Sequence, residues 1–364
     1  MDDAFNQGLS KRKAAYVQYP QAVPLKYAID ADHCIYFEKG KCRACEKFCP
    51  AGAVDFGQKE EVHHIDVGAV LLAAGSRALD PGLSKGYGYG RLPNVITSME
   101  MERILSATGP FRGHLTRPSD GEAPRKIAWL QCVGSRDTSP ESHSYCSGVC
   151  CMYAVKEAVI AKEHAGKDLD AAIFFMDMRT HGKDFDRYCE RAKDEMGVRF
   201  LRSRIHTVEE ESPDSGNLKL TYVDDAGALR SEAFDLVVLS TGLEIPEETK
   251  ELAHRLGIDM DPDGFVQTDC LRPVESSRPG VYVCGALGGP ADIPQSVVEA
   301  SAASSAAATL LAESRNTLIR EKTYPVERAV AEEAPRVGVF VCHCGINIGS
   351  VVDVPAVREY AQGL

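Results

Sequence analysis

Short apolar runs alternate with stretches of helical spacing along most of the chain. Continuous apolar runs such as 171–176 and 236–240 are typical of strands that are buried on both faces of a parallel sheet. Strands alternating with helices predict an α/β fold with a largely parallel sheet. We expect strands at 15–17, 61–73, 127–131, 171–176, 199–201, 218–223, 229–234, 236–240 and 281–284, and helices at 95–107, 150–164, 185–195 and 294–313.

The pattern changes near the end of the sequence. Residues 315–336 are charged and lack a clear period, which is typical of a linker. A new apolar strand is expected to begin at Val337, and the sequence ends at Leu364. Since this is too short for another α/β domain, we expect the last segment to be truncated.

Composition and charge exclude two classes of protein. A net charge of −12 argues against a nucleic-acid-binding surface, which needs a clustered basic patch. No apolar run approaches the length of about 18 residues that a membrane span requires. The first residues have neither an apolar core nor a cleavage site, so they do not form a signal peptide. We therefore expect a cytoplasmic protein that binds no nucleic acid and has no membrane span.

The 13 cysteines fall into tight groups, as ligands of metal clusters do. The first group has the spacing C-x7-C-x2-C-x3-C and is followed directly by proline. A C-x2-C-x3-C-P run is similar to that of bacterial ferredoxins, whose thiolates bind iron. A [4Fe–4S] cluster is the favoured interpretation, with a zinc knuckle or a disulfide left open. The four ligands would be Cys34, Cys42, Cys45 and Cys49.

The second group has the spacing C-x13-C-x3-C-C. Cys132 ends an expected strand, and the adjacent pair Cys150–Cys151 begins an expected helix, whose N–H groups and dipole stabilise anionic sulfur. The loop between them lacks the G-x-G-x-x-G of a nucleotide site. From the residues alone, a metal site, a redox-active thiol group and buried thiols all remain open. Cys146 completes the group.

Three apolar strands end in glycine turns, at Gly75, Gly242 and Gly285. Flavoproteins place such turns where the chain passes the dinucleotide, although α/β domains without flavin also have glycine exits. Asp292 follows the third turn near the start of a helix. The opening G-x-G-x-x-G of a flavin domain is not found in the sequence, so an isolated fragment would bind flavin weakly or not at all.

Three segments resemble the family of heterodisulfide reductase A subunits: WLQCVGSR, YCSGVCCMYAVKEA and SSRPGVYVCGALGGPADIPQSVVEASAASSAAATLL. The last also resembles the closing FAD motif of glutathione-reductase-type flavoproteins. The resemblance implies a thioredoxin-reductase-like fold that lacks its N-terminal FAD βαβ unit and contains an inserted ferredoxin-like segment. It also implies FAD and two [4Fe–4S] clusters, one of which displaces the pyridine-nucleotide site.

The resemblance divides the chain into segments and assigns roles to residues near the flavin. Lys156 would lie near flavin N5 as the catalytic cation, and Asp292 would contact the ribityl or pyrophosphate region. The backbone at Ile293, Pro294 and Gln295 would face the flavin pyrimidine edge; Glu100, Glu102 and Arg103 are weaker candidates. The expected segments are 1–25 (flavin domain), 26–58 (ferredoxin-like), 59–125 (FAD domain), 126–240 (nucleotide-domain-like, with the second cluster), 241–314 (closing FAD segment), 315–336 (linker) and 337–364 (start of a further domain).

The family implies an oxidoreductase that passes electrons between FAD and its clusters, with flavin-based electron bifurcation as a further implication. Expected partners are thiol-disulfide-reducing subunits, an electron-donor module such as a hydrogenase, ferredoxin, and a second copy of the chain within a larger complex. Two other classes stay open, an FAD-dependent pyridine-nucleotide disulfide oxidoreductase and an electron-transfer module without flavin chemistry. A zinc-stapled scaffold is the non-redox alternative.

The remaining cysteines have less pattern. Cys189 is predicted to be a buried thiol on an amphipathic helix, Cys284 to lie in the core at a strand end, and Cys270 to be single. Cys342 and Cys344 lie in a segment that resembles the very beginning of the same family, which suggests a second copy or a fused partner.

Overall fold

The computed structural model describes residues 1–166, 168–213, 215–343, 348–349 and 351–364. Two compact units make up the chain. One comprises Met1–His64 together with Ser314–Leu364, and the other comprises Ile65–Glu313. Each unit contains one of the two predicted cysteine groups.

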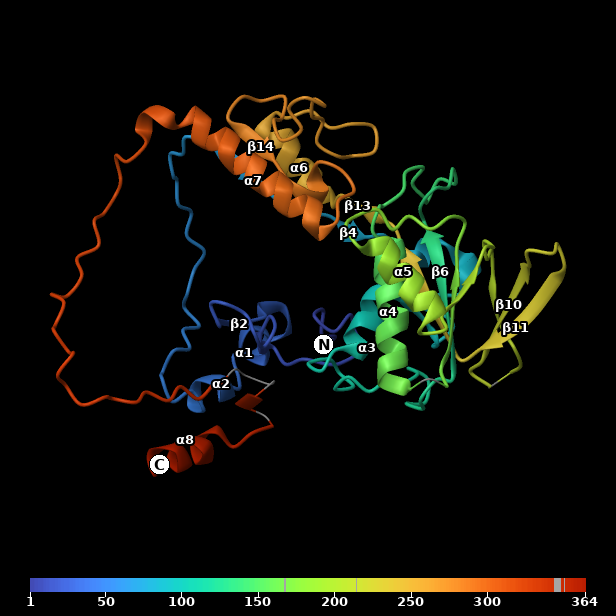
Figure 1. Cartoon of the computed structure of the whole chain (residues 1–364), viewed down its shortest axis with the longest axis horizontal. Helices are drawn as coiled ribbons and strands as arrows, with labels where there is room; N and C mark the ends of the chain where they lie inside the picture. Colours follow the sequence, from blue (N-terminus) through green and yellow to red (C-terminus); the bar gives the residue numbers. More distant parts are fainter. Residues whose placement is uncertain (167, 214, 344–347, 350) are drawn as a thin grey trace. The chain divides into compact units, whose positions relative to one another are not determined.

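A five-stranded parallel sheet is the centre of the larger unit (Figure 1). Its strand order is β5-β12-β6-β7-β8, so β6 lies in the middle, flanked by β12 and β7. Most residues of these strands are buried, as expected for a parallel sheet covered on both faces. The strands are β5 (Val95–Thr97), β6 (Lys126–Val133), β7 (Asp170–Phe174), β8 (Arg199–Leu201) and β12 (Leu236–Thr241).

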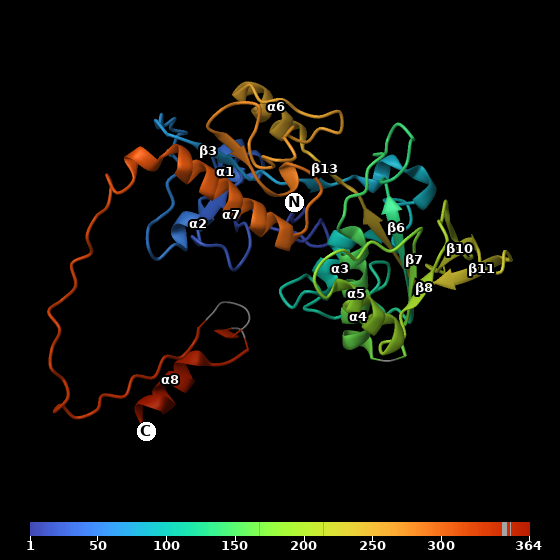
Figure 2. The same ribbon diagram turned by 45° about the horizontal axis from the view of Figure 1, so that its top comes forward.

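Three helices cover one face of this sheet, and an antiparallel sheet lies on the other (Figures 1 and 2). The helices are α3 (Ser98–Leu105), α4 (Cys150–Ala165) and α5 (Phe185–Asp194). α4 packs on β6, β7, α3 and α5. The antiparallel strands are β9 (Val208–Glu210), β10 (Leu218–Val223) and β11 (Leu229–Phe234).

A second, smaller sheet in this unit consists of β3 (Val70–Leu72) and β14 (Val281–Val283), which run parallel. α7 (Ile293–Leu310) packs against both strands. The remaining elements of the unit are α6 (Glu247–Leu256), the antiparallel pair β4 (Arg77–Ala78) and β13 (Leu243–Glu244), and the 3-10 turns Pro81–Leu83, Lys85–Tyr87 and Gly285–Leu287.

The smaller unit holds short elements. β1 (Ala15–Val17) pairs antiparallel with β2 (Tyr27–Ile29). The remaining elements are α1 (Ile35–Lys39), α2 (Ala44–Lys47), α8 (Val354–Gln362) and the 3-10 turn Ala31–His33. A further 3-10 turn, Ala312–Ser314, spans the point in the sequence where the larger unit ends. None of the helices in the described part of the chain is both long and apolar enough to cross a bilayer.

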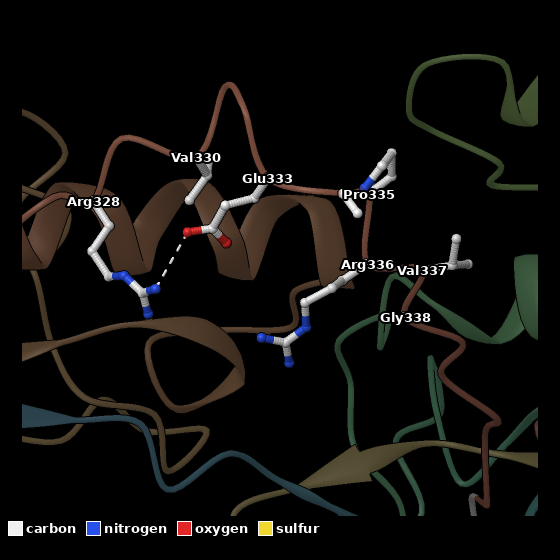
Figure 3. A pocket seen from close by; sticks show the side chains of 8 residues that line it. Arg328, Val330, Glu333, Pro335, Arg336, Val337 and Gly338 are labelled. Atoms are coloured by element: carbon white, nitrogen blue, oxygen red, sulfur yellow. Dashed lines mark hydrogen bonds and ion pairs between the residues drawn. The ribbon is translucent and has the colours of Figure 1, made fainter.

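Residues 328–338 of the smaller unit surround a small hollow (Figure 3). Arg328 donates to Glu333 across it at 3.3 Å. The residues that line the hollow include neither a cysteine nor a histidine, and none of them is a predicted cluster ligand or flavin contact.

Most predicted elements are present, and three predictions were wrong. The helix expected at 95–107 begins only at Ser98, because Val95–Thr97 pairs with β12 as a strand. The strand expected at 61–73 is limited to Val70–Leu72, where β14 provides a partner. Residues 337–343 form no strand, and Phe340 is 98% exposed; without a neighbouring strand, an apolar run gains no ladder of hydrogen bonds.

Candidate functional site

The second cysteine group lies at the carboxyl end of β6, the middle strand of the parallel sheet. Cys132 occupies the left-handed region with φ 60°, and the pairing of β6 with β12 shifts register at this point. A residue other than glycine in this region costs about 1–2 kcal/mol. This bulge brings Cys132 within hydrogen-bond reach of Cys150, the first residue of α4.

Three thiols of this group form a buried chain. Cys132, Cys150 and Cys151 are each at most 4% exposed, and Cys150 interacts with both of the others. The hydrogen bond from Cys150, followed by the charge of Arg136, lowers the pKa of Cys132 to about 7. Cys150 also lowers the pKa of Cys151, whereas hydrogen bonding to its two neighbours raises its own pKa. These shifts bring Cys132 and Cys151 closer to the thiolate, the form that binds iron.

Two arginines and one aspartate lie beside the same thiols, and the aspartate opposes the effect of the arginines on the pKa of Cys132 and Cys151. Arg136 and Arg179 form ion pairs with Asp177, and Arg179 does so at 3.1 Å. Asp177 raises the pKa of Arg179 most, and Cys146 adds to this effect, which places Cys146 beside Arg179. The structure therefore gathers all four predicted cysteines at one end of β6, beside two cations that favour anionic sulfur.

The first cysteine group lies in the smaller unit. Cys34 is buried, Cys42 is exposed, and Cys45 and Cys49 are partly buried. Cys42 and Arg43 are both left-handed, with φ 93° and 70°, which turns the C-x2-C stretch sharply. The Ala53 N–H donates to Cys49 Sγ at 3.3 Å, and it lowers the pKa of Cys49 more than any of the other backbone N–H groups that follow the proline. Such N–H groups are suited to a sulfur that carries negative charge.

Aromatic side chains connect the two ends of this cysteine segment. The rings of Tyr36 and Phe56 lie 4.1 Å apart between centroids, and the Arg43 guanidinium is 5.5 Å from each ring.

In the described part of the chain, no three His, Cys, Asp or Glu side chains converge closely enough for a single metal ion. A set of four thiolates suits an iron–sulfur cluster and also suits a zinc ion.

Lys156 lies on α4 one turn beyond Cys151 and forms an ion pair with Glu102 of α3 at 2.5 Å. Both side chains are partly exposed, at 43% and 33%. The other two flavin candidates on α3 have local partners. Glu100 closes the capping box with Thr97, and Arg103 donates to the Thr108 carbonyl at 3.2 Å. Glu102 is therefore the α3 residue that the structure joins to Lys156.

Glu157 is a buried acid that sequence reasoning missed. Its side chain is 0% exposed, and Trp129 Nε1 donates to its Oε2 at 2.9 Å. The other oxygen, Oε1, makes no hydrogen bond in the described structure. Burial, followed by the charge of Glu102, raises the pKa of Glu157 well above the ordinary value. A charged residue within a helix usually indicates an exposed face, so no local pattern indicated this burial.

Two of the three glycine turns share one sheet edge. Gly75 and Gly285 follow the paired strands β3 and β14, and both are left-handed, with φ 71° and 70°. Gly242 follows β12 of the central sheet instead. A Cβ at Gly242 would lie 2.3 Å from Ser135 Oγ, so contact with the cysteine loop explains this glycine. Sequence reasoning grouped the three turns, but the structure pairs only two of them.

The third turn continues into α7. Asp292 is the N-cap of α7, and its Oδ1 accepts from the Gln295 N–H at 2.8 Å. Ile293 and Pro294 are exposed at the first turn of the helix. Glu299, which sequence reasoning missed, accepts from the Gly285 N–H at 2.8 Å and from the Gln295 side chain at 2.8 Å. The i, i+4 spacing of Gln295 and Glu299 was the available signal.

The cap role and the predicted flavin role of Asp292 can be separated by two variants. We expect Asp292→Ala to lower the free energy of unfolding by about 1 kcal/mol, because α7 loses its N-cap. Asp292→Asn should retain that stability, since asparagine caps equally well. In the full-length protein with its flavin, both variants should bind flavin more weakly if the carboxylate contacts it. Urea denaturation and flavin titration measure the two effects, and unchanged flavin affinity in Asp292→Asn would limit Asp292 to the cap.

The remaining cysteines divide by exposure. Cys284 is buried at the end of β14, as predicted, and Cys270 is exposed. Cys189 is only partly buried, contrary to expectation; α5 packs against α4, and Ala192 is its buried residue. Burial and the nearby Cys151 raise the pKa of Cys189. Cys342 is exposed, and Cys344 lies outside the described residues.

Comparisons with known proteins agree with this architecture. The family model described as "Pyridine nucleotide-disulphide oxidoreductase" matches residues 29–304. The chain is 40% identical to the iron-sulfur A subunit of the CoB–CoM heterodisulfide reductase from Methanocaldococcus jannaschii, over 93% of this chain and 50% of that protein. It is also 40% identical to the A subunit of the H(2):CoB-CoM heterodisulfide,ferredoxin reductase from Methanothermobacter thermautotrophicus (strain Delta H), over 85% and 46%.

The chain thus spans about half the length of these curated relatives. Among solved structures, a T. acidophilum thioredoxin reductase aligns with 66% of this chain and 65% of its own, at 14% identity and a TM-score of 0.43. The predicted α/β class and the predicted resemblance to the heterodisulfide reductase A subunits are both confirmed.

Proposed function

The chain belongs to the pyridine nucleotide-disulphide oxidoreductase family, and from this premise we propose that it is the iron–sulfur flavoprotein part of a heterodisulfide reductase-type complex. Its role would be to pass electrons between FAD and two [4Fe–4S] clusters. One observation carries the proposal. A buried cysteine group occupies the carboxyl end of the middle strand, where a sheet of this kind otherwise binds a nucleotide.

The second cluster would be held by Cys132, Cys146, Cys150 and Cys151. Cys150 contacts both Cys132 and Cys151, and Cys146 adjoins Arg179. The N-terminus of α4 and the cations Arg136 and Arg179 would stabilise the negative charge of a cluster with four thiolates. A pyridine nucleotide would have to place its phosphates among these thiols. This arrangement supports the cluster over the nucleotide as the ligand of the central sheet.

The first cluster would be held by Cys34, Cys42, Cys45 and Cys49. The turn at Cys42, the N–H groups directed at Cys49 and the ring pair of Tyr36 and Phe56 support this assignment. Hydrogen bonds to cluster sulfur adjust its reduction potential, so the 51–54 backbone would act on the electrons that this cluster carries.

The residues present also fit a flavin. Gly75 and Gly285 form adjacent turns at one sheet edge. The first turn of α7 follows the Gly285 turn and is exposed. Asp292 and the backbone of Ile293, Pro294 and Gln295 would contact the flavin, and Lys156 would present a cation to it. When bound, the flavin would supply the two-electron carrier. The structure gives Gly242 a packing role, so we leave it out of the proposed flavin contacts.

We propose partners for this chain from the names of its relatives. One is named for the CoB–CoM heterodisulfide and another for H(2) and ferredoxin as well. We propose that the whole protein assembles in the cytoplasm with thiol-disulfide-reducing subunits and an electron donor such as a hydrogenase. Electron bifurcation and a homodimer within the complex are part of the same proposal.

Anaerobic purification with iron, sulfide and flavin analysis tests the proposal. Two cubanes give about eight iron and about eight acid-labile sulfide per chain. Flavin bound alongside would support a site made by residues of this chain. About four iron would reject one cysteine group, and zinc without sulfide would overturn the redox function.

A further inference from the structure

Three segments meet beside the second cysteine group. They are the end of β6 and the residues after it (133–136), the loop before α4 (143–147), and the stretch that connects β12 to β13 (241–243). The Gly242 N–H donates to the Val133 carbonyl at 2.9 Å, and the His143 N–H donates to the Gly134 carbonyl at 2.9 Å. Tyr145 Oη donates to the Leu243 carbonyl at 2.6 Å. Hydrogen bonds therefore connect the segment after Cys132 with the segment before Cys146, and both of these segments with the end of β12.

Two buried serines lie where these segments meet. Ser135 and Ser147 are 1% and 0% exposed, and their hydroxyl oxygens are 3.0 Å apart. The Leu243 N–H donates to Ser147 Oγ at 2.8 Å. Ser135 is three residues after Cys132, and Ser147 directly follows Cys146. The two hydroxyls therefore connect the residues near Cys132 and Cys146, which are two predicted ligands, to the backbone of Leu243.

Gly242 leaves the space that this contact needs. A Cβ at position 242 would lie 2.3 Å from Ser135 Oγ and 3.2 Å from Ser147 Oγ. The backbone at 242 is not in the left-handed region, so its conformation alone does not require glycine. The close approach of the two hydroxyls accounts for the glycine.

We propose that Ser135, Ser147 and the Leu243 N–H form a serine latch that fixes Cys132 and Cys146 for the second cluster. The inference rests on the proposed function, because it assigns these cysteines to a cluster. Ser147 is a positioning residue: it touches the chain that carries the ligands and sets their placement. A ligand held in this way keeps its sulfur at the cluster during reduction and reoxidation.

The test uses the anaerobically purified chain with its clusters, with the release of iron to a chelator as the first readout. Ser147→Ala leaves the partly buried Leu243 N–H without its acceptor, so iron release from the second cluster should become about tenfold faster. Ser147→Thr retains the hydroxyl and should restore the slower release. Gly242→Ala crowds both hydroxyls without removing either, and it should resemble Ser147→Ala. Ser139→Ala, an exposed serine in the same loop, is the matched control.

A second readout separates positioning from simple loss of stability. The EPR spectrum of the reduced second cluster should change in Ser147→Ala and Gly242→Ala and stay constant in Ser139→Ala. If the wild-type chain holds a second cluster and both variants retain its spectrum and release rate, the serine latch is rejected and the proposed function is retained. If the wild-type chain holds no second cluster, the proposed function is rejected and the role of the latch with it.

Discussion

Replacing Cys150 with serine is expected to lower bound iron and acid-labile sulfide from about eight to about four per chain. Cys150 is the middle member of the buried thiol chain, in contact with both Cys132 and Cys151. It is 2% exposed, so no solvent-borne ligand can readily take its place. Serine retains the size and polarity of the side chain but binds iron far less well than a thiolate does. Iron and sulfide analysis, with the optical spectrum, measures the loss.

Cys189→Ser is the matched control for this substitution. Cys189 lies on α5, close enough to Cys151 for that thiol to raise its pKa, yet it is outside the predicted ligand set. We expect this variant to retain about eight iron. Four iron in Cys189→Ser with eight in Cys150→Ser would show that the ligand set was assigned incorrectly. The comparison tests the choice of ligands separately from the presence of a cluster.

The sequence predicted elements best where periodicity and pairing agree. The hairpin strands 218–223 and 229–234 were predicted with the bounds that β10 and β11 have. A strand whose partner is distant was harder to place. Residues 95–97 looked like the start of a helix because the pairing with β12, about 140 residues later, is not visible in a local pattern.

Spacing also predicted which cysteines gather, but not what surrounds them. Cys132 and the pair Cys150–Cys151 lie where the end of a strand and the start of a helix placed them. The spacing of cysteines carries no information about Arg179, which approaches from beyond β7. The same limit applies to Gly242. Its sequence context matched the other glycine turns, and only the three-dimensional contact with Ser135 shows why it is glycine.

The pH dependence of stability should reveal Glu157. Its folded-state pKa is raised well above the ordinary value of 4.5, mainly by burial and next by the charge of Glu102. The folded chain therefore retains a proton that the unfolded chain releases, and the free energy of unfolding falls as pH rises from the unfolded pKa towards the folded one. The loss is at most about 1.4 kcal/mol per pH unit. Below the unfolded pKa the effect is absent.

Glu157→Gln should remove this loss, because glutamine is neutral at every pH and its carbonyl can still accept from Trp129 Nε1. Trp129 is the single tryptophan of the chain, so its fluorescence reports urea unfolding next to the substituted group. As pH rises above the ordinary value of 4.5, stability should fall more steeply in the wild type than in Glu157→Gln. Glu163→Gln, an exposed acid on the same helix, should follow the wild type. Parallel pH profiles for the wild type and Glu157→Gln would mean that Glu157 is already ionised in the folded chain. Its charge would then be compensated by Lys156 on the same helix, whose positive charge opposes the effect of Glu102 on α3.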